Sequence, residues 1–252
     1  MTDRPESGRI FLSVVVPAFN EEARIGQTLT SIRGYLLEKN FRSEIIVVDD
    51  GSRDRTAEEA GLALRGMAEV QIIRCPRNAG KGAALKEGIL RARGDFVLFS
   101  DADLSTPIEE LEKFWPLVDQ GCDVVIGSRA LPGADIQVRQ SPIRELMGKT
   151  FNVFVRLLVL KGIRDTQCGF KLFRGETARE VFPLIRTRGF SFDVETLSLC
   201  RRLGHRIAQV PVVWRNAPQS RVRIVRSSAR MFLDLLKIRR RVQRALPERK
   251  AP

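Results

Sequence analysis

The chain has 252 residues, of which 43% are hydrophobic and 29% are charged, a composition typical of a folded globular protein. Its longest stretch without Asp, Glu, Lys or Arg covers residues 10–20, well short of the roughly 18 apolar residues of a membrane span, and its polar first ten residues lack a secretory signal. The four cysteines lie 32 to 47 residues apart and His205 is the single histidine, which excludes a Cys/His zinc site and favours reduced thiols in the cytoplasm.

The net charge of +13 is concentrated at the end of the chain. Residues 1–200 contain 28 Lys and Arg against 28 Asp and Glu, whereas residues 201–252 contain 15 against 2. A segment with this much positive charge is attracted to polyanions, so the candidate partners are nucleic acid, anionic lipid and a phosphorylated substrate.

Strand and helix patterns alternate over the first half of the chain. Short apolar runs predict strands at residues 11–16, 44–48, 70–74, 95–100 and 123–126. Apolar residues at helical spacing predict helices at residues 21–37, 56–67, 83–92 and 107–118. This alternation predicts an α/β fold with a mostly parallel sheet flanked by helices.

The pattern changes after Gly127. Residues 128–142 are predicted to form a loop, and residues 143–160 a long helix that packs in the core or contacts a membrane. A short strand within residues 165–173, helices at 177–185 and 194–203, a strand at 206–213 and a basic loop at 215–226 follow. The last predicted helix, residues 227–246, is amphipathic, with arginines opposite its apolar side.

Polar residues follow the predicted strands, where ligands of parallel sheets bind. Asp101 and Asp103 follow a buried strand, and two such carboxylates favour Mg²⁺ or Mn²⁺. The alternative for this pair is a helix cap and a solvated acid. Asp50 could bind a base or a ribose, or simply belong to a turn. Lys81 lies in a glycine-rich turn that lets a phosphate approach the backbone, although such a turn is often only a turn.

Together, the strings PAFNE (17–21), VVDDGSRDRT (47–56), NAGKGAA (78–84), DAD (101–103) and GSR (127–129) resemble glycosyltransferase family 2 with the GT-A fold. SPIR (141–144), DTQCGFKLF (165–173) and FDVE (192–195) resemble the dolichyl-phosphate and polyprenyl-phosphate glucosyltransferases within it. The resemblance implies a GT-A domain over residues 1–226, with a nucleotide half at about 10–130 and an acceptor half at about 131–226. A basic helix and tail at 227–252 complete the chain.

The resemblance also implies residue roles. The nucleotide would be bound by Pro17, Phe19, Glu21, Val48, Asp50, Lys81, Asp101 and Ala102. The metal would be held by Asp103 and Asp101, and the residues implied at the reacting sugar and diphosphate are Asp101, Asp103, Arg129, Asp193 and Glu195. Arg144 and Arg221 would clamp the acceptor phosphate.

The implied reaction is metal-dependent, inverting transfer of glucose from UDP-glucose to a polyprenyl or dolichyl phosphate. The lipid phosphate is already anionic, so no strong general base is required. GDP-mannose and UDP-N-acetylglucosamine remain alternative donors. However, Ser105 stands where mannosyl-type relatives often carry Gln as a further metal ligand, which favours the glucosyl branch. Phe19 replaces their frequent Tyr and removes a hydroxyl from the base pocket, which disfavours recognition of guanine.

Two other classes of function compete with this interpretation. A non-catalytic sugar-nucleotide-binding protein is disfavoured by the intact DAD, GSR and FDVE strings. A nucleic-acid-binding protein is disfavoured because the basic tail has little aromatic interleaving and no known binding motif. Because the implied acceptor lies in a membrane, we expect peripheral attachment to an anionic surface on the cytoplasmic side, through the last helix. The alternative is that this helix packs on the domain.

Overall fold

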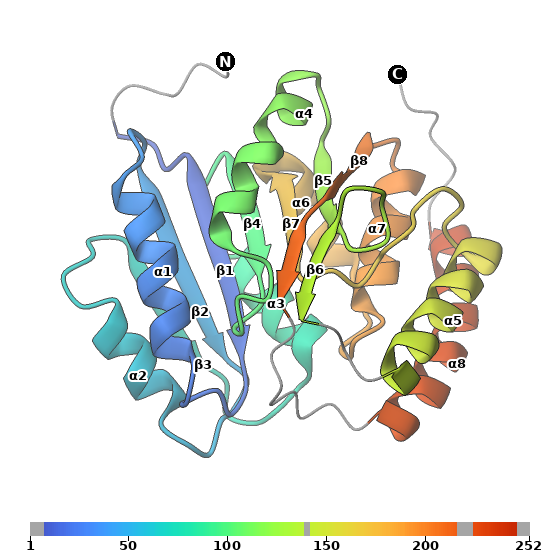
Figure 1. Ribbon diagram of the computed structural model, residues 1–252, viewed down its shortest axis with the longest axis horizontal. Coiled ribbons are helices and arrows are strands. Elements are labelled where there is room, and N and C mark those ends of the chain that lie inside the picture. Colours follow the sequence, from blue (N-terminus) through green and yellow to red (C-terminus); the bar gives the residue numbers. More distant parts are fainter. Residues whose placement is uncertain (1–7, 139–141, 216–223, 246–252) are drawn as a thin grey trace.

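A seven-stranded sheet forms the centre of the molecule, with strand order β3-β2-β1-β4-β7-β5-β8 (Figure 1). The structure, a computed structural model, describes residues 8–138, 142–215 and 224–245, without the side chains of residues 142–147, 149, 224–233 and 245. The strands are β1 (Leu12–Ala18), β2 (Ser43–Asp49), β3 (Val70–Arg74), β4 (Phe96–Ser100), β5 (Val124–Ser128), β7 (Phe170–Arg174) and β8 (Ile207–Pro211). Only β7 runs antiparallel to its neighbours, β4 and β5, which confirms the predicted mostly parallel sheet.

Helices cover both faces of the sheet because alternate strand residues point to opposite sides. One face packs against α1 (Ile25–Leu37), α2 (Thr56–Ala63), the 3-10 helix η1 (Ile108–Lys113) and α4 (Trp115–Asp119). The other packs against α3 (Lys81–Ile89), α6 (Gly175–Val181), the 3-10 turn η2 (Phe182–Leu184) and α7 (Phe192–Arg202). Helix α8 (Ile224–Ala245) packs against α7, and α5 (Pro142–Leu158) packs against α8, at the right in Figure 1.

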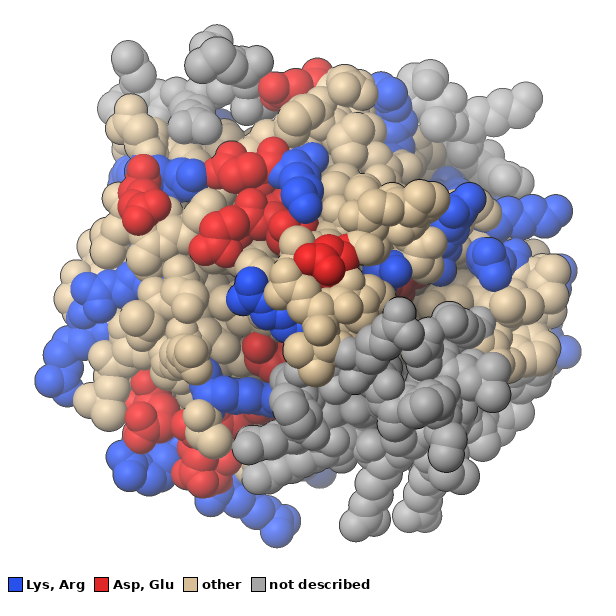
Figure 2. Space-filling model, viewed as in Figure 1, with Lys and Arg blue, Asp and Glu red and all other residues tan. Residues whose placement is uncertain are grey.

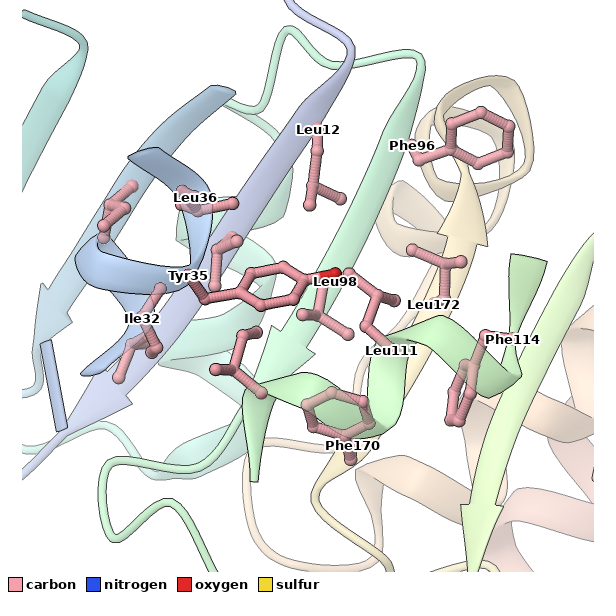
Figure 3. Packing of buried hydrophobic residues seen from close by; sticks show 14 of the residues in the cluster. Leu12, Ile32, Tyr35, Leu36, Phe96, Leu98, Leu111, Phe114, Phe170 and Leu172 are labelled. Atoms are coloured by element: carbon pink, nitrogen blue, oxygen red, sulfur yellow. The ribbon is translucent and has the colours of Figure 1, made fainter. Parts of the chain in front are cut away.

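The core on the first face is formed by large side chains from α1, the strands and η1. Tyr35 of α1 lies between Ile32 and Leu98, and Phe170 and Phe114 pack edge to face with ring centroids 5.4 Å apart (Figure 3). These contacts hold α1 against β4 and Phe114, between η1 and α4, against β7. They therefore fix the strand ends from which the candidate site residues project.

Two predicted helices are shorter than their apolar spacing suggested. Residues 107–118 divide into η1 and α4, and residues 177–185 into α6 and η2. Each division has a proline close to it, Pro116 in the first turn of α4 and Pro183 within η2. A proline lacks the N–H that would continue the hydrogen bonding of the preceding helix.

A second, two-stranded sheet pairs β6 (Asp135–Val138) with β9 (Val213–Arg215). The sequence had predicted a loop over residues 128–142, so this part of the prediction was wrong. All four residues of β6 are exposed, and its partner lies more than 70 residues away. A short strand exposed on both sides carries no burial pattern, so no hydrophobic pattern in the sequence indicated it.

Helix α8 packs on the domain through its apolar side. Leu235, Ile238 and Val242 are buried in the same core cluster as α7. The helix begins at Ile224, three residues before the predicted start. Among the described residues, no helix has the length and apolar character that crossing a membrane would require.

Candidate active site

The loops that follow β1 and β2 are hydrogen-bonded to each other. The backbone N–H of Asn20 donates to Ser52 Oγ at 2.9 Å, and that of Glu21 donates to Thr56 Oγ1 at 2.8 Å. In return, Asn20 Oδ1 accepts the backbone N–H of Arg53 at 2.9 Å. The PAFNE and DDGSRDRT strings therefore form one structural unit at the carboxyl edge of the sheet.

Asp50 holds the glycine-rich turn that follows β3. Its two carboxylate oxygens accept the backbone N–H groups of Ala79 and Gly80, each at 2.8 Å. Burial raises the pKa of this carboxyl group, and the two N–H donors oppose that effect. Asp50 thereby fixes the position of Lys81, the first residue of α3.

Lys81, Asp101 and Gly169 meet at the centre of the site. Lys81 Nζ lies 2.6 Å from Asp101 Oδ1, and the Asp101 N–H donates to the carbonyl of Gly169 at 3.1 Å. A Cβ atom on Gly169 would lie 1.9 Å from Asp101 Oδ2, so only glycine leaves room for this carboxylate. The DTQCGFKLF string thus directly supports the DAD string.

The other DAD residues complete a tight turn after β4. Asp103 Oδ1 accepts the N–H of Ser105 at 3.0 Å, and the carbonyl of Ala102 accepts the hydroxyl of Thr28 at 2.7 Å. Leu104 has a φ of 44°, a left-handed conformation that a non-glycine residue seldom adopts and that often accompanies a functional turn.

The chemistry of these two acids fits a divalent cation shared with a ligand. Among the described residues, no cluster of three or more His, Cys, Asp or Glu could hold a metal by itself. Mg²⁺ and Mn²⁺ are commonly bound by one or two carboxylates together with substrate phosphates and water. Asp101 and Asp103 match that incomplete protein ligand set.

Arg24 belongs to this site but was missed by the sequence analysis. Its guanidinium binds both carboxylate oxygens of Glu21, with Nη2 at 2.7 Å from Oε1. The Glu21 hydrogen bond raises the pKa of Arg24, and the nearby Asp103 and Asp101 add to this. Its Nη1 is buried and has no hydrogen-bond partner within the described part of the chain. The available signal was the three-residue spacing of Glu21 and Arg24 at a helix start.

Arg129 is held rigidly at the end of β5. Its backbone N–H and Nε donate to Asp165 Oδ2 at 3.0 and 2.7 Å, and its Nη2 donates to Asp165 Oδ1 at 3.0 Å. The guanidinium also lies 5.4 Å from the ring centroid of Trp214. Burial opposes ionisation of Asp165, but Arg129 outweighs it and lowers the pKa of Asp165 to about 2. Both groups therefore stay charged at neutral pH.

Asp193 is bound by a buried lysine that the sequence analysis did not single out. Lys171 Nζ donates to Asp193 Oδ1 and to the carbonyl of Cys168, each at 2.5 Å. Burial raises the pKa of Asp193, and the charges of Lys171 and Lys81 oppose that rise. A lysine within the apolar string FKLF was the signal available in the sequence.

Glu195 lies two residues from Asp193 but faces other groups. Its Oε2 accepts the backbone N–H groups of Arg186 and Thr187 at 3.1 and 2.6 Å. Its Oε1 accepts Arg241 Nη1 of α8 at 2.7 Å. Both oxygens are thus bound by other parts of the chain, and this separates Glu195 from the Lys81–Asp101 pair.

The remaining predicted residues differ in how far they can contact a ligand. Phe19 is 41% exposed at the edge of the site, whereas Pro17 is buried. The side chain of Val48 is fully buried in the core, so it faces away from any ligand. Arg144 falls within α5, but its side chain lies outside the described residues, as does the whole of Arg221.

Comparison of the sequence with known proteins identifies the family to which the chain belongs. The sequence profile of Glycosyl transferase family 2 matches residues 13–182, which include the site residues from Pro17 to Lys171 but not Asp193 or Glu195. The chain belongs to glycosyltransferase family 2. The fold and the family together establish it as a transferase built on the GT-A architecture, as the sequence predicted.

This glycosyltransferase is similar to several curated relatives over most of their length. Dolichyl-phosphate beta-glucosyltransferase of Dictyostelium discoideum is 37% identical, covering 91% of this chain and 74% of the relative. The proteins of the same name from Saccharomyces cerevisiae and Homo sapiens are 34% and 36% identical, covering 95% and 91% of this chain and 77% and 75% of the relatives.

Solved structures of the same architecture support the fold of this glycosyltransferase. Glucosyl-3-phosphoglycerate synthase from Mycobacterium tuberculosis, in complex with phosphoglyceric acid, has a TM-score of 0.68 and 25% identity, covering 92% of this chain and 80% of that one. The same synthase in complex with Mn²⁺, UDP and glucosyl-3-phosphoglycerate also has a TM-score of 0.68, at 24% identity, covering 95% and 86% of the two chains.

Proposed function

We propose that this glycosyltransferase moves glucose from UDP-glucose to a polyprenyl phosphate of the dolichyl type, with inversion at the anomeric carbon. The observation that carries the proposal is the junction of Lys81, Asp101 and Gly169. It joins the loops expected to bind the nucleotide to the DTQCGFKLF string of the glucosyltransferase branch. The shared name of the relatives supports the same substrates.

A divalent cation, Mg²⁺ or Mn²⁺, is proposed to be held by Asp103 and Asp101 together with the donor diphosphate. When bound, it would neutralise the charge that develops on the leaving diphosphate. The Mn²⁺ and Mg²⁺ complexes of the mycobacterial synthase, both with UDP, support this choice. The pairing of Lys81 with Asp101 adds a cation beside the same phosphates.

The chain's own residues then account for the remaining steps. Phe19 and Glu21 bind the base and the ribose, and Arg24 holds the carboxylate of Glu21 in place. Arg129, fixed by Asp165, donates its remaining N–H groups to the donor diphosphate or sugar. Asp193, whose Oδ1 is held by Lys171, offers its second oxygen to the sugar hydroxyls.

The acceptor phosphate requires positioning more than activation. Its oxygen is anionic at neutral pH, so it attacks the anomeric carbon without a general base. Arg144 and Arg221 are proposed to hold this phosphate in line with the bond that breaks. Attack from the opposite face to the leaving diphosphate converts an α-linked donor into a β-linked lipid phosphate sugar.

A transfer assay with radiolabelled donors tests the proposal. Purified protein is incubated with UDP-glucose, GDP-mannose or UDP-N-acetylglucosamine, a polyprenyl phosphate in detergent, and Mg²⁺ or Mn²⁺. We expect label from UDP-glucose in the lipid phase, reduced to background by EDTA. Transfer from GDP-mannose instead would overturn the donor assignment. Nucleotide binding with no transfer from any donor would favour a binding protein over an enzyme.

We also propose that α5 and α8 form the surface that contacts the acceptor's membrane. Val153, Phe154 and Leu157 of α5 and Leu236 of α8 are exposed, Leu157 by 70%. On α8, Lys237, Arg240 and Arg244 follow at helical spacing and are exposed. Lys and Arg side chains lie along the right-hand edge of the molecule, where Figure 1 places these helices (Figure 2). Apolar and cationic side chains together fit an anionic bilayer surface.

Replacing Leu157 with aspartate is expected to weaken vesicle binding at least about tenfold, because one leucine inserted into lipid contributes roughly 1.5–3 kcal/mol. Sedimentation with vesicles of phosphatidylcholine and phosphatidylserine measures the change. Leu62→Asp is the matched control, because Leu62 is 50% exposed on α2, away from α5 and α8. Equal binding by both variants and the unchanged protein would contradict this surface.

A further inference from the structure

We propose that Glu195 is a positioning residue that connects α8 to the turn carrying Lys81, so that the seating of α8 controls affinity for the donor nucleotide. This inference rests on the proposed function and adds a route by which the membrane-facing helix acts on the donor site. It assigns Glu195 a task different from the sugar contact that the sequence implied.

The first link joins α8 to α7. Arg241 Nη1 lies 2.7 Å from Glu195 Oε1, with the Glu195 side chain 1% exposed and that of Arg241 33% exposed. Ser191, the residue before α7, donates a hydrogen bond from its Oγ to Asp234 Oδ2 of α8 at 3.4 Å. Because Glu195 is buried, its charge depends on the ion pair with Arg241 for stabilisation. A change in the position of α8 would therefore change the environment of this carboxylate.

The second link joins Glu195 to the segment before α7. Its other oxygen accepts the N–H groups of Arg186 and Thr187. A single carboxylate therefore bridges a guanidinium on α8 and two backbone groups of residues 186–187. Movement of Arg241 relative to α7 would act on both sets of bonds at once.

The third link joins this segment to the donor turn. The carbonyl of Arg188 accepts the N–H groups of Gly82 and Ala83 at 2.8 and 3.3 Å. A Cβ on Gly80 would lie 2.5 Å from that carbonyl, and one on Gly82 would lie 2.6 Å from the carbonyl of Thr187. The two backbones are packed too closely to move independently. Lys81, between the two glycines, therefore follows the position of residues 186–188.

The contacts form an unbroken path from Arg241 through Glu195 and residues 186–188 to Lys81, which pairs with Asp101 at 2.6 Å. When α8 is seated, Lys81 is held where the donor diphosphate is expected. When the contact between Arg241 and Glu195 is lost, the turn that carries Lys81 keeps its fold, but the position of Lys81 is less restricted. The expected consequence is weaker donor binding, with little change in the rate at saturating donor.

The test compares Arg241→Gln, Glu195→Gln and the double variant in the full chain, without membranes. Titration calorimetry with UDP and Mn²⁺ measures binding, and the transfer assay gives KM for the donor and kcat. We expect Arg241→Gln to weaken UDP binding and raise KM about fivefold, the usual size of such couplings. Arg241→Lys keeps the charge and is expected to recover part of the loss. Arg239→Gln, an exposed arginine on another side of α8, is the matched control.

The double variant separates positioning from stability. It removes both charges, so its melting temperature should return toward that of the unchanged protein, whereas its donor KM should stay raised. If KM instead follows the melting temperature, or if Arg241→Gln binds UDP normally, the inference is overturned. If the unchanged protein binds neither UDP nor UDP-glucose, the proposed function fails first, so the two failures are distinguishable.

Discussion

Replacing Gly169 with alanine is expected to lower the rate of sugar transfer at least about a hundredfold, the usual cost of misplacing a reacting group by about 1 Å. The new Cβ would lie 1.9 Å from Asp101 Oδ2 and 2.2 Å from its Cγ, where real Cβ contacts stay beyond 3.0 Å. The carboxylate must therefore move, and its ion pair with Lys81 must move with it. The transfer assay, with donor and metal concentrations varied in turn, measures the loss.

Gly34→Ala provides the control for this substitution. Gly34 lies in α1, is exposed and has open space where a Cβ would be added. Alanine favours helix over glycine by about 1 kcal/mol, so this variant should be as active and at least as stable as the unchanged protein. If Gly169→Ala melts normally and retains full activity, the placement of Asp101 is not what limits transfer.

The sheet could be predicted well from the sequence because each strand buries an apolar run. The first five predicted strands lie within two residues of the observed ones at both ends, and β3 matches at both. The antiparallel direction of β7 could not be predicted, because the string FKLFR favours a strand without indicating the direction in which it runs. The pair β6–β9 was missed because its register depends on contacts between distant segments.

The candidate site, like the fold, could be predicted only in part from the sequence. Asp50, Lys81 and Asp101 were predicted to lie together, since parallel strands place their carboxyl ends at one edge. The partner of each side chain was not predictable from the sequence. Asp50, for example, accepts backbone N–H groups with both carboxylate oxygens instead of facing outward. The pairing of Lys171 with Asp193 also depends on tertiary packing between β7 and α7.

Replacing Asp165 with asparagine is expected to destabilise the fold by about 3 kcal/mol, because it removes a buried carboxylate and leaves the partly buried charge of Arg129 without its partner. Asp165 is 1% exposed and accepts three hydrogen bonds from Arg129. For a chain of this size, such a loss corresponds to a melting temperature lower by about 6–12 °C. Differential scanning calorimetry at pH 7 measures the shift. The transfer rate should fall too, since Arg129 would no longer be held in place.

The pH dependence of this effect follows from the sign of the pKa shift. Arg129 lowers the pKa of Asp165 from its usual 3.8 to about 2. The stability that ionisation of Asp165 contributes, about 2 kcal/mol, is therefore fully present above pH 3.8 and is lost as pH falls toward 2. The difference in unfolding free energy between the unchanged protein and Asp165→Asn should accordingly narrow as pH falls from about 5 to about 2.

Glu58→Gln is the control that distinguishes the ion pair of the buried Asp165 carboxylate from an ordinary surface ion pair. Glu58 pairs with Arg74 at 2.6 Å, but both side chains are at least half exposed, so water already solvates each charge. This variant should melt close to the unchanged protein at pH 7. If Asp165→Asn behaves as Glu58→Gln does, Arg129 is not held by Asp165 in solution. Arg129 would then be free to turn away from the donor, and the mechanism would need another fixed cation at the end of β5.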